Sequence, residues 1–135
     1  MTRWKRMSKQ ERGSSLTELA LILPLLALMV MGIVDLGRAF HDYVVITNAS
    51  RVGARYASRF PDEGGRIVSA AQQDAANNGL DGLINVQIDT VGANAGESIR
   101  VTTTYQFHTF LGGMIGHPIV TLKHTTEMVV FGIDD

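Results

Sequence analysis

Apolar residues are distributed unevenly along the chain, and their spacing predicts one long helix followed by a small sheet. Residues 19–34 form an unbroken run without a charge, flanked by Glu18 and Asp35. The run is apolar on every side, which excludes a surface helix of a soluble domain. At about 1.5 Å per residue it reaches about 24 Å, whereas residues 14–34 reach about 31 Å and can span a bilayer core. We therefore expect a transmembrane helix over residues 14–34.

The same helix is expected to continue as an amphipathic stalk over residues 35–59. Apolar and β-branched positions recur there at spacings of three and four: Leu36, Phe40, Tyr43, Val44 and Thr47. Proline and two glycines within residues 60–65 then end the helix. The stalk is the natural cover for whatever apolar surface the rest of the chain presents.

Residues 60–135 show the pattern of a small α+β domain. Residues 66–78 favour a short helix, and residues 83–89, 98–110 and 119–131 favour strands because apolar and polar positions alternate. Short connections allow antiparallel pairing, and the one-sided apolar pattern requires a cover. The predicted fold class is α+β, with a long N-terminal membrane-spanning helix that continues as an amphipathic stalk and packs on a small antiparallel sheet of about three strands.

Charge divides the chain and predicts its orientation. The formal net charge is −1, but residues 1–12 carry +4, which leaves −5 on the others. Basic residues before an apolar span keep the N-terminus cytoplasmic, so residues 1–13 would be a cytoplasmic leader and residues 60–135 extracytoplasmic. An acidic body has no broad phosphate-binding surface, so we expect no nucleic-acid partner. Ordinary signal-peptide removal, with a mature protein that starts at Phe40, is an alternative, although Asp35 and Arg38 would place charges at the cleavage region.

The segment from Gly13 to Glu18 has two compatible interpretations. In one, Ser15 caps the helix and Glu18 reaches back to its amide. In the other, cleavage after Gly13 creates an amine at Ser14, one helical turn from the Glu18 carboxylate. An amine and a carboxylate so spaced can neutralise each other or the equivalent group of a neighbouring subunit. Both interpretations favour a helix that packs beside copies of itself or relatives.

The sequence offers little for catalysis or metal binding. It contains no cysteine, which excludes a thiol nucleophile and a cysteine-based zinc site. The four histidines have no zinc spacing, and there is no glycine-rich phosphate loop and no nucleophile elbow. We expect no enzymatic activity, no metal and no cofactor.

Two surfaces are candidate partner contacts. Arg51, Arg55 and Arg59 share one helical face, which is either a solvated face near a helix C-terminus or a contact for an acidic partner. Residues 111–116, which include Met114 and Ile115, form an apolar stretch that we expect to be a flexible loop, used either for contact or for buried packing.

From Gly13 onward the chain resembles the TadE-like pseudopilins of the tight-adherence (Flp-type) pilus system. The resemblance is carried by RGSSLTELALILPLLALMVMGIVDLGRAF and ITNASRVGARYA, with weaker support from VTTTYQF and TLKHTTEMVVF. It implies peptidase cleavage between Gly13 and Ser14, and it makes Glu18 the assembly glutamate at the fifth mature position. Asn48, Arg51, Gly53 and Arg55 match a helix motif of the family. Leu19 stands where major pilins have a tyrosine, as is more usual in pseudopilins.

The resemblance implies a minor pilin or pseudopilin that acts in assembly of the pilus, anchored once in the inner membrane and open to incorporation in a surface pilus. Its implied partners are other pilins and pseudopilins, the prepilin peptidase, the pilus assembly platform and membrane lipids. The alternatives are a permanently anchored membrane protein with an extracytoplasmic binding domain, and a secreted soluble domain.

Overall fold

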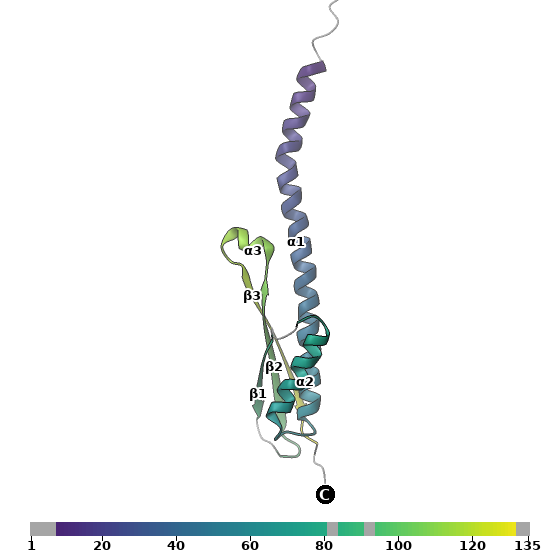
Figure 1. The fold of residues 1–135 in the computed structure, drawn as a ribbon, viewed down its shortest axis with the longest axis vertical. Helices are drawn as coiled ribbons and strands as arrows, with labels where there is room; N and C mark the ends of the chain where they lie inside the picture. Colours follow the sequence, from purple (N-terminus) through teal and green to yellow (C-terminus); the bar gives the residue numbers. More distant parts are fainter. Residues whose placement is uncertain (1–7, 81–83, 91–93, 132–135) are drawn as a thin grey trace, which may run out of the picture.

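The computed structural model describes residues 8–80, 84–90 and 94–131, with the side chains of residues 8–14 and 90 excepted. The elements in chain order are α1 (Ser8–Ala57), α2 (Gly64–Asn77), β1 (Ile84–Thr90), β2 (Ser98–His108), α3 (Phe110–Ile115) and β3 (Ile119–Val129). Figure 1 shows α1 as a long rod whose C-terminal half is packed against the other elements, while its N-terminal half projects alone. The predicted α+β fold is confirmed.

Helix α1 is longer at its N-terminus than the sequence pattern predicted. It begins at Ser8 and has 50 residues, about 75 Å at the usual rise of an α-helix. Residues 8–12 are mostly good helix formers, so nothing before Gly13 stops the helix. Ser15 consequently lies inside the helix, and the predicted cap at that residue is wrong. The helix continues through Pro24 and ends at Ala57, two residues before the predicted end.

The sheet has three antiparallel strands in the order β1-β2-β3. Val101 of β2 lies opposite Ile88 of β1 and Thr126 of β3, so these positions share the face that α1 and α2 cover. The opposite face carries charged, amide and threonine side chains, among them Gln87, Arg100 and Lys123. The strand predictions are confirmed with small shifts at their ends, and the predicted strand residue Leu83 lies outside the described residues.

The core lies between the sheet and the two longer helices. One cluster joins α1 to the end of α2 and the start of β1: Val45, Ile46, Ala49, Ala75, Leu80 and Ile84. A second cluster joins the end of α1 to α2 and the sheet: Ala54, Ala57, Ile67, Ile99, Val101 and Val130. Helix α1 contributes to both clusters, so the domain is built around the stalk and has no separate core.

The buried side of the stalk differs from the predicted one. Leu36 and Phe40 are 73% and 69% exposed, whereas small residues such as Ala49 and Ala54 are fully buried. Small side chains let the backbone of α1 approach the sheet, so that the buried Thr103 hydroxyl of β2 donates to the Ile46 carbonyl at 2.8 Å. The apolar stripe of the stalk is therefore not its contact side at Leu36 and Phe40, and Val45 and Ile46 are buried beside the small residues instead.

Gly53 marks the point where α1, α2 and β2 come closest. A Cβ at this position would lie 3.1 Å from Val101 Cγ1 and 3.2 Å from the Ala71 Cβ. Gly37, on the same helix, has nothing within 4 Å of a Cβ built there and is exposed. The two glycines thus differ in packing although both lie inside α1.

We expect Gly53→Leu to lower the free energy of unfolding by about 1–3 kcal/mol, because an overpacked seam must separate. The matched variant Gly37→Ala should raise it by about 0.5–1 kcal/mol, since alanine favours an exposed helix interior. Chemical unfolding of the full chain in detergent micelles, followed by near-ultraviolet circular dichroism, measures both. A Gly53→Leu chain as stable as the parent would contradict the close packing of the three elements.

Candidate functional site

The N-terminal half of α1 has no protein cover in the described part of the chain. Its large apolar side chains between Leu16 and Val34 are 40–75% exposed, except Met31, which is partly buried. Of the helices that the structure describes, α1 is the one long and apolar enough to cross a membrane. Apolar surface of this extent is unfavourable in water, so a lipid environment or other helices must cover it.

The candidate processing site and the candidate assembly glutamate both belong to this bare half. The backbone at Gly13 and Ser14 is helical. Glu18 is exposed and forms no ion pair with any residue that the structure describes. Four residues separate Ser14 from Glu18, so helical geometry places them on one side of α1, about one turn apart.

Asp35 stands where the bare half ends, and it is a buried carboxylate with two backbone partners. Its Oδ1 accepts a hydrogen bond from the Phe110 amide at 3.1 Å, and its Oδ2 accepts one from the Leu111 amide at 2.8 Å. These amides open helix α3 and have no partner within that helix. The side chain is only 7% exposed. Asp35 therefore fastens the tip of the β2–β3 hairpin to α1.

The same hydrogen bonds govern the ionisation of Asp35, which follows the span of residues 14–34. The Leu111 amide is the main cause that holds the pKa of this carboxyl below its ordinary value. The Phe110 amide and the Arg38 guanidinium act in the same direction, and desolvation opposes them. The folded protein thus favours the charged form.

Arg38 and Gly32 complete the attachment of the hairpin tip. The Arg38 Nη1 lies 3.6 Å from Asp35 Oδ1, and the two residues are three positions apart on α1. Its guanidinium carbon lies 4.6 Å from the centre of the Phe110 ring, within the range of a cation–π contact. One turn before Asp35, a Cβ on Gly32 would lie 3.1 Å from Leu111 Cδ1, so the hairpin packs directly on the helix. We call these five residues the latch: Gly32, Asp35, Arg38, Phe110 and Leu111.

The stretch predicted to be a flexible loop is a short helix, so that prediction is wrong. The Thr109 hydroxyl caps α3 by accepting from the Gly112 amide at 2.9 Å, and Gly116 ends it with a φ of 85°. A Cβ on Gly112 would collide with Thr109 and with the His117 carbonyl, so glycine is required there for packing. Met114 and Ile115 are 67% and 72% exposed, which leaves both available for contact.

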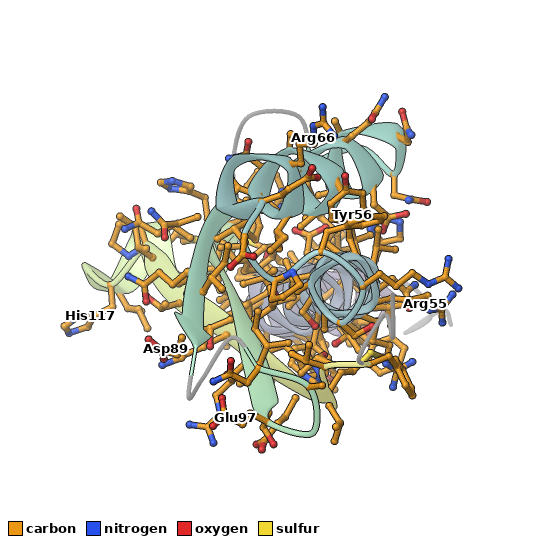
Figure 2. All side chains as sticks on the ribbon, turned by 90° about the horizontal axis from the view of Figure 1, so that it is seen from below. Arg55, Tyr56, Arg66, Asp89, Glu97 and His117 are labelled. Carbon is orange, nitrogen blue, oxygen red and sulfur yellow. The ribbon has the colours of Figure 1, made fainter. Side chains whose placement is uncertain are left out.

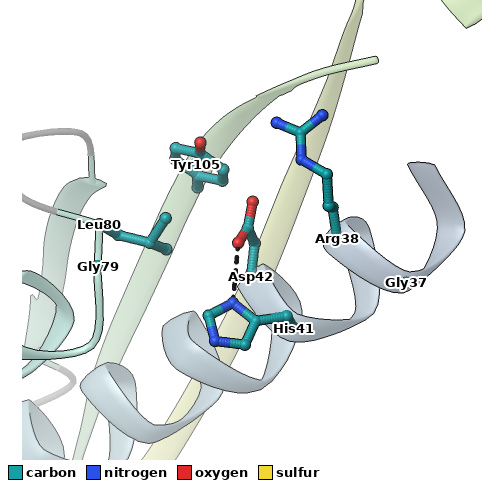
Figure 3. Close-up of a pocket in the computed structure, with 7 residues that line it drawn as sticks. All are labelled: Gly37, Arg38, His41, Asp42, Gly79, Leu80 and Tyr105. Carbon is teal, nitrogen blue, oxygen red and sulfur yellow. Dashed lines mark hydrogen bonds and ion pairs between the residues drawn. The ribbon is translucent and has the colours of Figure 1, made fainter. Parts of the chain in front are cut away.

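A polar hollow of about 400 Å³ opens between α1, the end of α2 and β2 (Figure 3). Asp42 lies between Arg38 and Tyr105, and its Oδ1 is 3.2 Å from His41 Nδ1. Burial raises the pKa of the Tyr105 hydroxyl, Asp42 adds to this effect, and Arg38 opposes it. Across the described residues no group of three histidine or acidic side chains could hold a metal ion. The hollow offers hydrogen bonds to a polar group and has no nucleophile paired with a base.

The arginine face lies at the other end of the stalk. Asn48, Arg51, Arg55 and Arg59 are all exposed, and Figure 2 shows Arg55 pointing away from the sheet and from α2. These arginines form no ion pair within the described chain. A hollow of about 330 Å³ beside them is lined by Val52, Tyr56 and Phe60. Arg51 is 16 residues beyond Asp35, or about 24 Å along the helix, so the predicted contact residues form two separate surfaces.

The tie between Asp35 and α3 could not be read from the sequence, because the partners are 75 and 76 residues apart. The available signal was the aspartate at the end of the apolar run together with its arginine three residues on. That pattern predicts the local pair and contains no information on the hairpin amides.

We expect Asp35→Asn to speed hydrogen exchange at the Phe110 and Leu111 amides at neutral pH. Asparagine has one carbonyl oxygen, so one of the two amides loses its acceptor and the other loses a charged one. Acid should act in the same way. The pKa of Asp35 in the folded chain lies below the ordinary value of 3.8. The stabilisation that the charged carboxylate gives to the folded state is therefore complete above pH 3.8 and is lost as the pH falls through the folded-state pKa.

The control for this experiment is Asp42→Asn, which alters an acid on the same helix without touching α3. It should leave exchange at both amides unchanged. Unaltered exchange in the Asp35→Asn chain would show that the carboxylate does not hold the hairpin tip.

Comparison with known proteins finds one similarity, over the bare half of α1 and most of the stalk. The model of the TadE-like protein family matches residues 13–55. No curated protein and no solved structure gives a significant match to the chain. The matched segment begins at the candidate processing site and includes Glu18, Asp35 and the first two arginines of the arginine face. Over residues 13–55, the chain is similar to the TadE-like protein family.

Proposed function

We propose that this chain is a minor pilin or pseudopilin that acts in the assembly of a tight-adherence pilus. The family match associates the chain with that pilus system, and the finer role is our inference. One observation carries it: the matched residues 13–55 include the whole apolar segment that the domain leaves uncovered. A helix that is bare at one end and rigidly packed at the other suits a subunit that exchanges lipid for neighbouring helices.

The exposed apolar side of the stalk supports packing against other subunits. Leu36, Phe40 and Val44 follow one another at four-residue spacing and are 73%, 69% and 42% exposed. They continue the apolar surface of the bare half for about two turns beyond Asp35. A side of this kind fits helix-to-helix contact with another pilin or pseudopilin, where apolar side chains replace lipid.

The proposed mechanism is physical. Residues 1–13 hold the N-terminus in the cytoplasm, and the helix stores the subunit in the inner membrane with residues 60–135 outside. The prepilin peptidase removes the leader, and the new amine at Ser14 compensates Glu18 of the same or an adjacent subunit. Extraction from the bilayer is unfavourable until neighbouring helices cover the apolar surface, so the assembly platform must supply the work. We propose no catalytic role, no cofactor and no nucleic-acid partner.

The latch argues against the secreted alternative. Cleavage before Phe40 would remove Gly32, Asp35 and Arg38, which hold the hairpin tip. The remaining domain would lose the acceptor for the first amides of α3. The packing of the domain does not distinguish the proposed processed subunit from a permanently anchored protein that keeps residues 1–13.

The mass of the mature protein distinguishes these functions. In cells that make the pilus apparatus, we expect an N-terminus at Ser14, whereas permanent anchoring predicts Met1 and secretion predicts Phe40. Gly13→Leu should abolish processing, because a bulky side chain blocks approach to the scissile bond. Gly37→Ala, at an exposed glycine further along α1, should be processed normally. Normal processing of the Gly13→Leu chain would count against the site.

Glu18→Gln tests the assembly glutamate separately from processing. The amide keeps the size of the side chain but removes the charge that would attract the Ser14 amine. We expect normal cleavage and a several-fold decrease in the fraction of the protein that crosslinks to other pilus subunits. Asp89→Asn, which removes an exposed acid on the outer face of β1, should crosslink like the parent. An unchanged crosslinked fraction in Glu18→Gln would indicate that the glutamate stabilises the helix and has no role in assembly.

A further inference from the structure

Helix α3 exposes apolar side chains at the end of the domain that faces the bare half of α1. Figure 1 shows α3 at the point where α1 emerges from the domain. Phe110, Met114 and Ile115 are 58%, 67% and 72% exposed, and Ile119 and Val120 extend the patch into β3 at 49% and 46%. Residues 109–116 contain no charged side chain. Apart from Arg38 against the Phe110 ring, nothing in the described part of the chain covers this patch, although exposure of apolar surface to water is unfavourable.

The latch sets the position of this patch along α1. The first two amides of α3 bind Asp35, and Leu111 lies against Gly32, within the last turn of the span of residues 14–34. Any bilayer that covers residues 14–34 must therefore end at the level of α3. The exposed Leu36 and Phe40 lie at the same level or just beyond it on the opposite part of the helix surface.

We propose that α3 is an interfacial anchor whose apolar side chains enter the boundary between headgroups and acyl chains of the extracytoplasmic leaflet. The occupant is lipid because the patch continues the lipid-facing surface of α1 at the depth where the bilayer ends, and because apolar side chains of short amphipathic segments bury there. The strands lead away from α3, and their outer face carries hydroxyl, amide and charged side chains. Helix α3 thereby adds a second contact with the membrane and limits rotation of the whole chain about the axis of α1.

This inference rests on the proposed membrane anchoring of α1, and the test separates the two. The chain contains no cysteine, so single cysteines can carry nitroxide labels in the full chain without other changes. The reporter is Ile115→Cys, a substitution at an exposed side chain that the fold tolerates. Leu26→Cys reports the bare half of α1, and Gln87→Cys reports the exposed outer face of β1.

The labelled chains are placed in vesicles of phosphatidylethanolamine and phosphatidylglycerol, and collisions with oxygen and with a water-soluble nickel chelate are measured. Oxygen concentrates in acyl chains, whereas the chelate stays in water. We expect the oxygen-to-chelate ratio at Ile115 to exceed that at Gln87 several-fold and to approach that at Leu26. Adding Asp35→Asn to the Ile115→Cys chain should lower the ratio, because the hairpin tip is no longer held at that depth.

Two results would overturn the anchor. A ratio at Ile115 equal to that at Gln87 would place α3 in water, and protection from both reagents would place it against a protein surface such as a second copy. If Leu26 is lipid-exposed in either case, α3 fails as an anchor while the membrane helix stands. If Leu26 is as accessible to the chelate as Gln87, the proposed anchoring itself fails together with the inference. Met114→Cys, at the neighbouring exposed position, must give the same result as Ile115→Cys.

Discussion

One helix has to satisfy two environments, and the arrangement of the whole chain depends on that constraint. Helix α1 is continuous for 50 residues, so no joint separates the bare apolar half from the half that forms the core of the domain. The change of environment occurs within about one turn, between Val34 and Arg38. Asp35 lies in that turn, where a carboxylate would be unfavourable in lipid unless it is paired. The hairpin amides supply the pairing, so the domain itself completes the end of the bare half of α1.

The stalk and the domain cannot be regarded as separate units. The sheet, with strands of 7 and 11 residues, has one apolar face that needs a cover. Ala49, Ala54 and Ala57 of α1 are fully buried against it, and Ser50 bonds to Thr126 of β3 at 2.7 Å. Because these contacts run along α1, a force that moves the helix also moves the sheet. A subunit that is pulled out of a bilayer by its helix requires this kind of connection.

Periodicity in the sequence was sufficient to predict the two longer helices and the three strands. It was not sufficient to predict the side of α1 on which the domain packs. Leu36 and Phe40 have the spacing of a core-facing stripe, yet they are exposed, because hydrophobicity does not distinguish a side that faces the domain from one that faces lipid or another helix. The true contact side combines Val45 and Ile46 with alanine, glycine and serine, and a hydrophobic pattern underestimates the small residues. The latch could not be predicted for another reason: the hydrogen bonds that the amides of residues 110 and 111 donate to the Asp35 carboxylate have no local sequence signature. Helix α3 has only six residues, fewer than two turns, so no repeat could reveal it.

The distribution of surfaces around α1 follows from these contacts. Gly32, Asp35 and Gly53 face the hairpin and the sheet, whereas Leu36, Phe40 and Val44 lie on a different side and carry no cover from the described domain. The arginine face is a third side, since Arg55 points away from both α2 and the sheet in Figure 2. A helix with one side occupied by its own domain can accept neighbours on the others without displacing that domain. The small size of the buried residues is what makes this possible, because a larger contact side would have required the domain to wrap around the stalk and cover the side that remains open.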